Sequence, residues 1–204
     1  MRCFIAIDID EKIRKAIANV QERLAAKVDI KQGDVKWVEP ENIHLTLKFL
    51  GEINDEQSAS PNAGETSPKG GAAEVCDITK QVAETYKNFN IDVESVGSFG
   101  GRSAKVVWVG VTKGAEELLT LQKDLENRLS QAGYPPEERE FSAHLTVCRV
   151  KNLKAGFKLA EVVGQFAKLK LGSVAANAIH VYQSQLTPAG PVYTLLGSFK
   201  LAKD

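Results

Sequence analysis

Two histidines stand in matching settings in the two halves of the chain. The tetrapeptide HLTL at 44–47 and the tetrapeptide HLTV at 144–147 share the pattern His-x-Thr-x and lie 100 positions apart. The chain contains only 3 histidines, so a chance repeat of this setting is improbable. In a β-strand, residues i and i+2 point to the same face, so each histidine would project beside its threonine. Two such strands facing a cleft would place two imidazoles and two hydroxyls around one point.

These four side chains are suited to acid–base chemistry at a phosphate group. Imidazole titrates near neutral pH, so one of His44 and His144 can act as the base while the other acts as the acid. The hydroxyls of Thr46 and Thr146 can donate hydrogen bonds to a non-bridging phosphate oxygen. A zinc site is the rival interpretation, but a catalytic zinc needs three protein ligands and no acidic cluster accompanies the motifs. The pattern therefore predicts phosphoryl transfer without a metal or another cofactor.

The remaining histidine and the cysteines suggest no second centre. His180 lies in an apolar run with Ile179 and Val181, which predicts a structural or surface role. The three cysteines are far apart in the sequence and form no CxxC pair, which argues against disulfides and a structural zinc site. We expect reduced, buried or half-buried thiols in a cytoplasmic protein. The cysteines are Cys3, Cys76 and Cys148.

Length and composition limit the class of protein. The 204 residues are 43% hydrophobic, with 26 basic against 26 acidic side chains, which predicts one domain, or one two-lobed domain, with a substantial core. Such a chain is too apolar to be disordered and too neutral to coat nucleic acid. No apolar run approaches the roughly 20 residues of a membrane span. The start, MRCFIAIDID, turns acidic too early for a signal peptide.

Hydrophobic periodicity predicts mixed helices and strands with hairpin-like pairs, which favours an α+β fold with antiparallel sheets. In the strand over 43–50, alternation places Phe49 on the apolar face and Lys48 on the polar face of His44. Residues 52–73 are rich in Ser, Pro and Gly and predict a mobile loop. No glycine-rich nucleotide motif is present. Helices are expected at 11–27 (capped by Asp8 or Asp10), 74–88, 115–131 and 157–166, and strands at 2–8, 35–38, 43–50, 89–96, 105–111, 143–150, 168–174, 178–186 and 192–200.

The chain resembles the 2H phosphoesterase superfamily, and within it the RNA 2′,3′-cyclic phosphodiesterases, also called the 2′-5′ RNA ligase family. The resemblance rests on the paired motifs and on RCFIAIDI, VKWVEPENIHLTLKFLGE, VVWVGV, FSAHLTVCRV and VYQSQLTPAGPVYTLLGSF. It implies a single bilobal domain over 1–204, in which two antiparallel sheets with outer helices are related by a pseudo-twofold axis around a cleft. It also implies metal-independent opening of RNA 2′,3′-cyclic phosphate ends to 2′-phosphates, with reversible 2′-5′ ligation. The expected partner is such an RNA end, as on tRNA fragments, bound by a monomer.

The resemblance also implies roles for individual residues. His44 would protonate the leaving ribose oxygen, and His144 would activate the attacking water. Thr46 and Thr146 would hold the phosphate, and Arg149 would contact the phosphate or the cleft. Strict alternation, however, turns Arg149 away from His144, so it reaches the site only if the strand ends, twists or bulges. Otherwise it would form a surface ion pair.

Three further side chains and two rival functions remain open. Lys48 would either touch the phosphate or stay solvated, while Phe99 and Tyr193 would either stack on a base or pack against the protein. One rival is a 2H enzyme that acts on small cyclic nucleotides or on ADP-ribose cyclic phosphate. The other is a catalytically idle module that binds RNA ends, and the two intact histidines argue against it.

Overall fold

The strands join into one sheet. A computed structural model of the chain describes residues 1–31, 33–53, 71–188 and 190–203. Nine strands of these residues form a single antiparallel sheet in the order β7-β4-β5-β6-β3-β1-β8-β9, and β2 pairs with β6. The strands are β1 (Arg2–Asp8), β2 (Val35–Trp37), β3 (His44–Glu52), β4 (Phe89–Phe99), β5 (Val106–Val111), β6 (His144–Val150), β7 (Lys170–Ala176), β8 (Ala178–Thr187) and β9 (Gly190–Lys200).

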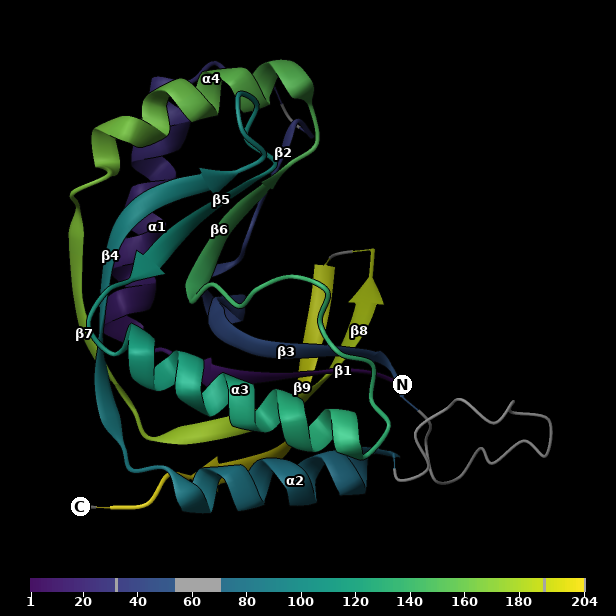
Figure 1. The fold of residues 1–204 in the computed structure, drawn as a ribbon. Coiled ribbons are helices and arrows are strands. Elements are labelled where there is room, and N and C mark those ends of the chain that lie inside the picture. The colour runs from purple at the N-terminus through teal and green to yellow at the C-terminus, as the bar shows by residue number, and fades with distance from the viewer. Residues whose placement is uncertain (32, 54–70, 189, 204) are drawn as a thin grey trace.

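The two histidine motifs begin the two central strands of this sheet. β3 and β6 meet where Leu45 pairs with Leu145, and both leucines are fully buried. Outward from this junction, one half continues through β5, β4 and β7 and the other through β1, β8 and β9. Each half is a four-stranded antiparallel unit, and the two halves curve toward each other (Figure 1). The predicted α+β fold with antiparallel strands and two lobes is confirmed, but the two sheets expected from the sequence are one continuous sheet, because β3 pairs with β6.

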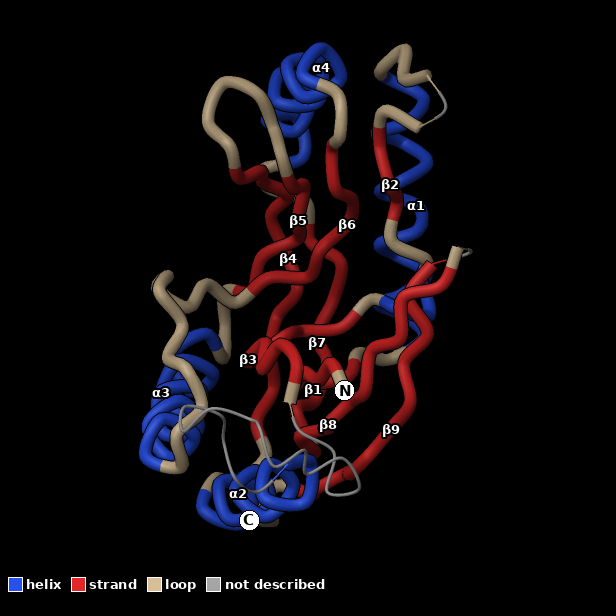
Figure 2. The backbone as a smooth tube through the Cα atoms, turned by 90° about the vertical axis from the view of Figure 1, so that its right-hand side faces the viewer, coloured by secondary structure: helices blue, strands red, loops and turns tan. Residues whose placement is uncertain are grey.

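The helices cover the outer faces of the two halves. α1 and α4 pack on the half that contains β7, β4 and β6, whereas α2 and α3 pack on the half that contains β9, β8 and β3 (Figures 1 and 2). The helices are α1 (Glu11–Lys27), α2 (Gly71–Thr85), α3 (Ala115–Gln131) and α4 (Leu153–Val163), with short 3-10 turns η1 (Pro40–Asn42) and η3 (Gly164–Phe166).

Helical periodicity selected the correct buried faces. The side chains predicted to face the core of α1 and α3 are all at most 1% exposed, because the apolar positions recur at three- and four-residue intervals. Asp10 rather than Asp8 caps α1, since its carboxylate accepts a hydrogen bond of 2.8 Å from the Ile13 amide. The core side chains are Ile13, Ile17, Val20 and Leu24 of α1 and Leu118, Leu121, Leu125 and Leu129 of α3.

Several predicted boundaries were wrong. The loop assigned to 52–73 is shorter at both ends, because β3 continues to Glu52 and α2 already begins at Gly71. The rest of that predicted loop, 54–70, lies outside the described residues. The helix expected at 157–166 begins at Leu153, because the side chain of Asn152 accepts hydrogen bonds from the amides of Lys154 and Ala155 and so caps it earlier.

The cysteines and the helices agree with the sequence analysis in two further respects. None of the three cysteines, all of which belong to the described part of the chain, forms a disulfide. Cys3 and Cys148 are buried and Cys76 is half-buried. No helix among the described residues has both the length and the apolar content that crossing a membrane requires.

Candidate active site

The pairing of β3 with β6 brings the two motifs onto one face of the sheet. Because the strands are antiparallel and Leu45 pairs with Leu145, His44 lies across from Thr146, and Thr46 lies across from His144. All four polar side chains are half-buried. The two imidazoles therefore occupy diagonal corners of a four-residue cluster, and the two hydroxyls occupy the other corners.

Each imidazole is oriented by a backbone carbonyl two residues earlier. Nδ1 of His44 lies 2.8 Å from the carbonyl oxygen of Asn42, and Nδ1 of His144 lies 2.7 Å from that of Ser142. A carbonyl oxygen only accepts, so Nδ1 is the donor in both rings. Nε2 is then left with a lone pair in the neutral ring and with a proton in the cation. Both histidines can consequently take up or release a proton through Nε2.

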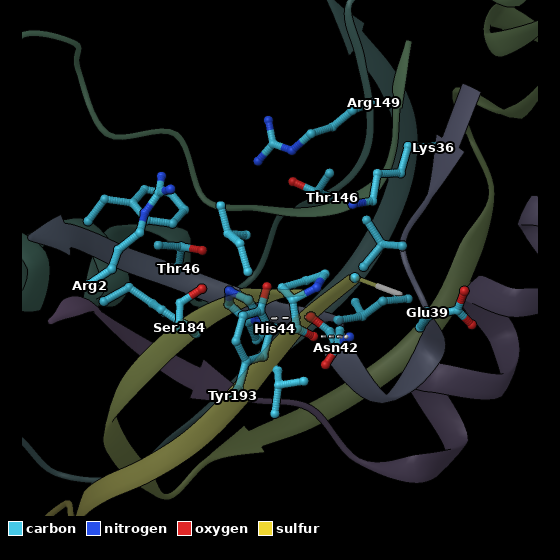
Figure 3. A pocket seen from close by; sticks show the side chains of 18 of the residues that line it. Arg2, Lys36, Glu39, Asn42, His44, Thr46, Thr146, Arg149, Ser184 and Tyr193 are labelled. Atoms are coloured by element: carbon cyan, nitrogen blue, oxygen red, sulfur yellow. Dashed lines mark hydrogen bonds between the residues drawn. The ribbon is translucent and has the colours of Figure 1, made fainter. Parts of the chain in front are cut away.

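Aromatic side chains enclose His44. Its ring stacks on Phe4 with centroids 4.7 Å apart and meets Tyr193 edge-on at 5.4 Å (Figure 3). This burial lowers the pKa of His44, because desolvation disfavours the imidazolium, while the Asn42 carbonyl and the Asp8 carboxylate partly oppose the effect. In the unliganded protein, the His44 ring therefore stays neutral to a lower pH than an exposed histidine.

A cavity of about 590 Å³ opens beside the motif cluster. Its wall contains His44, Thr46, Thr146, Arg149 and Tyr193, contributed by β3, β6 and β9 (Figure 3). The structure thus brings together most of the residues that the sequence singled out.

The histidine and the aromatic residue that the sequence singled out in the other lobe do not line this cavity. His144 starts the strand that carries Thr146, but it is not one of the residues that line the cavity. Phe99, which the sequence offered for base stacking, meets the His144 ring edge-on at 5.1 Å. It also lies outside the cavity wall.

β3 and β6 share a bulge immediately after the motif threonine. Along β1, Ala6 pairs with Thr46 and Ile5 with Lys48, so Leu47 is skipped. In the same way, the β5 pairing passes from Thr146 to Cys148 and skips Val147. A bulge adds one residue to a strand and re-aims the side chains that follow it. Strict alternation therefore fails at the same place in both motifs.

The bulge makes Lys48 a core residue, so neither predicted alternative for it was right. Lys48 is 2% exposed, and its Nζ lies 2.8 Å and 2.9 Å from the two carboxylate oxygens of Glu126. The same Nζ donates to the carbonyl of Pro135 at 2.8 Å, so all three of its N–H groups are used. Lys48 faces α3 and the loop after it, away from the phosphate that the sequence placed near His44.

The same bulges turn Phe49 and Arg149 into the cavity. The two side chains occupy equivalent positions in the two motifs, and both line the cavity. Phe49, expected on the apolar inner face, is 52% exposed. Arg149 reaches the cavity through a bulge, the condition that strict alternation required for it. The two equivalent positions therefore present different chemistry to the cavity, one aromatic and one cationic.

Comparison with known proteins assigns the family. The model of the 2′-5′ RNA ligase superfamily matches residues 9–187. The chain belongs to this superfamily. Among its relatives named RNA 2′,3′-cyclic phosphodiesterase, that of Methanothermobacter thermautotrophicus is 33% identical over 202 residues, covering 98% of this chain and 99% of the relative. That of Thermotoga maritima is 35% identical over 199 residues, covering 96% and 93%.

Solved structures confirm the fold of this superfamily member. TT0787 of Thermus thermophilus superposes with a TM-score of 0.75 at 24% identity, covering 98% of both chains. Escherichia coli LigT complexed with 3′-AMP superposes with a TM-score of 0.72 at 22% identity, covering 98% of this chain and 97% of LigT.

The sequence analysis missed several cavity residues of this superfamily member. Arg2, Lys36, Asn42 and Ser184 line the cavity from β1, β2, the turn before β3, and β8. In the sequence, these residues stand out only as polar side chains in or beside short predicted strands. Which of them meet in space depends on strand register across long separations, which local periodicity does not reveal.

The third histidine lies apart from the cavity. Nε2 of His180 lies 3.7 Å from a carboxylate oxygen of Asp8, and His180 does not line the cavity. Among the described residues, no group of three or more His, Cys, Asp or Glu side chains is arranged to hold a metal ion. The histidine pair is thus the chemically distinctive feature of the site.

Proposed function

We propose that the protein hydrolyses the 2′,3′-cyclic phosphate at the end of an RNA strand, leaving a 2′-phosphate and a free 3′-hydroxyl. One observation carries the proposal: two His-x-Thr motifs lie on one face of the sheet at the junction of two pseudo-symmetric lobes. Membership of the 2′-5′ RNA ligase superfamily and relatives named RNA 2′,3′-cyclic phosphodiesterase support it.

The two histidines divide the proton transfers between them. Nε2 of neutral His144 takes a proton from water as the water oxygen attacks phosphorus. Nε2–H of protonated His44 gives its proton to the ribose 3′ oxygen as the bond from that oxygen to phosphorus breaks. His144 ends protonated and His44 neutral, so one proton exchange with solvent restores the starting state. If the 5′-hydroxyl of a second RNA end takes the place of water, the same two proton transfers join the two ends through a 2′-5′ phosphodiester as the 3′ oxygen leaves.

The threonines and Arg149 hold the phosphate during this exchange. The hydroxyls of Thr46 and Thr146 donate to the non-bridging oxygens, where negative charge builds up as water adds. The guanidinium of Arg149 faces the same cavity and favours an anionic substrate. A phosphate anion next to His44 would also raise the pKa of that ring, which favours its role as the acid.

The biological setting proposed here is an RNA end met by a single protomer in the cytoplasm. The net charge of zero suits contact with a strand end, such as that of a tRNA fragment, better than a long duplex. Three cysteines without a disulfide fit a reducing compartment. Gel filtration at several protein concentrations tests the monomer, because an elution volume that shifts with concentration would contradict it.

The test is incubation with an RNA oligonucleotide that ends in a 2′,3′-cyclic phosphate. The product should gain the mass of one water and become sensitive to phosphatase, and its phosphate should sit on the 2′ oxygen. An unchanged RNA end would contradict the proposal. If only a small cyclic nucleotide or ADP-ribose cyclic phosphate is opened, the enzyme belongs to another 2H group. Binding without turnover would identify a module that only recognises RNA ends.

A further inference from the structure

Lys36 and Arg149 form a pair of like charges in the cavity wall. The two residues face each other directly in the antiparallel pairing of β2 with β6. Both are exposed and both line the cavity. Figure 3 shows both side chains on the same side of the cavity as Thr146, with Arg149 above that residue and Lys36 to its right.

Among the described residues, no carboxylate neutralises this pair. Like charges placed directly opposite each other in a sheet are destabilising. Within the described part of the chain, no carboxylate forms an ion pair with Lys36 or Arg149. The cavity wall contains a third cation, Arg2, and one acid, Glu39, whose carboxylate points away from the other side chains in Figure 3. An anionic ligand is thus the natural counter-charge.

Lys36 and Arg149 lie beside the histidine cluster, at the distance of a neighbouring phosphate. Arg149 follows Thr146 by three residues, and the bulge at Val147 shortens the separation. At about 3.3 Å per strand residue, the backbone positions are roughly 7–10 Å apart. This is comparable to the spacing of successive phosphates along an extended RNA strand. Lys36 is therefore placed to meet a second phosphate while the first is held by the threonines and Arg149.

We propose that Lys36 binds the phosphodiester on the 5′ side of the terminal nucleotide, while Arg149, directly opposite Lys36 in the strand pairing, contacts the reactive phosphate. This inference rests on the proposed function and narrows it, because the preferred substrate is then an RNA of at least two nucleotides. A mononucleotide cyclic phosphate would fill the reactive site and leave Lys36 without its anion.

Binding tests the second phosphate site without requiring turnover. The probes are a mononucleotide and a dinucleotide that each end in a 2′-phosphate, and the same dinucleotide with an uncharged methylphosphonate linkage. The wild type should prefer the charged dinucleotide. Lys36→Met should weaken that binding about 5- to 30-fold, leave the other two probes unchanged, and lower the salt slope of the charged dinucleotide by about 0.7.

Two other outcomes of the binding experiment would contradict the second phosphate site. An equal loss on all three probes would assign Lys36 to the terminal phosphate, and no loss on any probe would remove Lys36 from binding; both contradict the inference. Lys80→Met is the matched control, since Lys80 is exposed on α2 and lies outside the cavity wall. It should behave as the wild type with every probe.

Kinetics separates this inference from the proposed function. Lys36→Met should raise KM for an oligonucleotide cyclic phosphate, keep its kcat, and leave a mononucleotide cyclic phosphate unaffected. If the wild type opens both substrates and Lys36→Met has the same kinetics with each, only the second phosphate site is contradicted. If the wild type opens neither cyclic phosphate, but Lys36→Met still binds the charged dinucleotide more weakly, the proposed function is contradicted and the second phosphate site is supported.

Discussion

Lys48 of β3 and Glu126 of α3 form an ion pair in which Lys48 is buried and Glu126 is half-buried, with Nζ 2.8 Å from Oε1. The same carboxylate oxygen accepts a hydrogen bond from the Glu137 amide, and the same ammonium donates to the carbonyl of Pro135. The Glu137 side chain in turn accepts from the amide of Phe49 at 3.3 Å. This network fastens α3 and the loop after it to β3, at the point where the bulge turns Phe49 into the cavity.

Breaking this pair on one side should cost stability. Lys48→Met leaves the half-buried Glu126 carboxylate without its counter-charge, so the free energy of unfolding in urea should fall by about 1–3 kcal/mol. Adding Glu126→Leu removes the unpaired carboxylate, so the double variant should recover much of the lost stability. A Lys48→Met protein as stable as the wild type would show that the pair contributes little to the fold.

The threonines should matter less than the histidines. Thr46→Ala or Thr146→Ala removes one neutral donor to a charged oxygen, an interaction of about 1.5–3 kcal/mol. The rate of cyclic phosphate opening should therefore fall roughly 10- to 100-fold in single-turnover experiments. Thr85→Ala, on the surface of α2, is a matched control that should keep the parental rate. Parental rates in both motif variants would exclude the hydroxyls from phosphate binding.

His44 should titrate below the ordinary histidine value of 6.5 in the ligand-free protein, because burial lowers its pKa. Between the lowered pKa and 6.5, the unfolded chain binds a proton that the folded chain does not, so stability falls as the pH falls through this window. NMR titration of the ring measures the pKa, and inorganic phosphate in the cavity should raise it. A free-protein pKa at or above 6.5 would contradict the effect of burial.

Chelation should leave the reaction intact. The proposed proton transfers use two imidazoles and two hydroxyls, so hydrolysis of a cyclic phosphate should proceed at the parental rate in EDTA. The measurement compares initial rates before and after dialysis against the chelator. Activity that disappears and then returns with one divalent ion would replace the proposed mechanism with a metal-assisted one.

Periodicity was a good guide to the helices and to the first half of each motif strand. The α3 leucines are buried as predicted because each needs only its own helical face to find the core. His44 and Thr46 share a face because two-residue alternation holds as far as the threonine. These features depend on local spacing, which the sequence displays directly.

Features set by pairing between distant strands were not predictable in this way. The bulge at Leu47 depends on the register of β3 against β1, and it exchanges the expected environments of Lys48 and Phe49. Lys36 reaches the cavity because β2 pairs with β6, more than a hundred residues later in the chain. Local alternation carries no information on either register.

The most direct test of the two-histidine mechanism is the single-turnover rate of cyclic phosphate opening in variants of the pair. His44→Ala and His144→Ala should each lose about 10²- to 10⁴-fold, and the double variant should lose much less than the product of the two. The wild-type rate should rise and then fall with pH, with both limbs set by the pair. His180→Ala should stay near the parental rate. If either His44→Ala or His144→Ala retains the parental rate, or if only His180→Ala abolishes turnover, the mechanism is wrong.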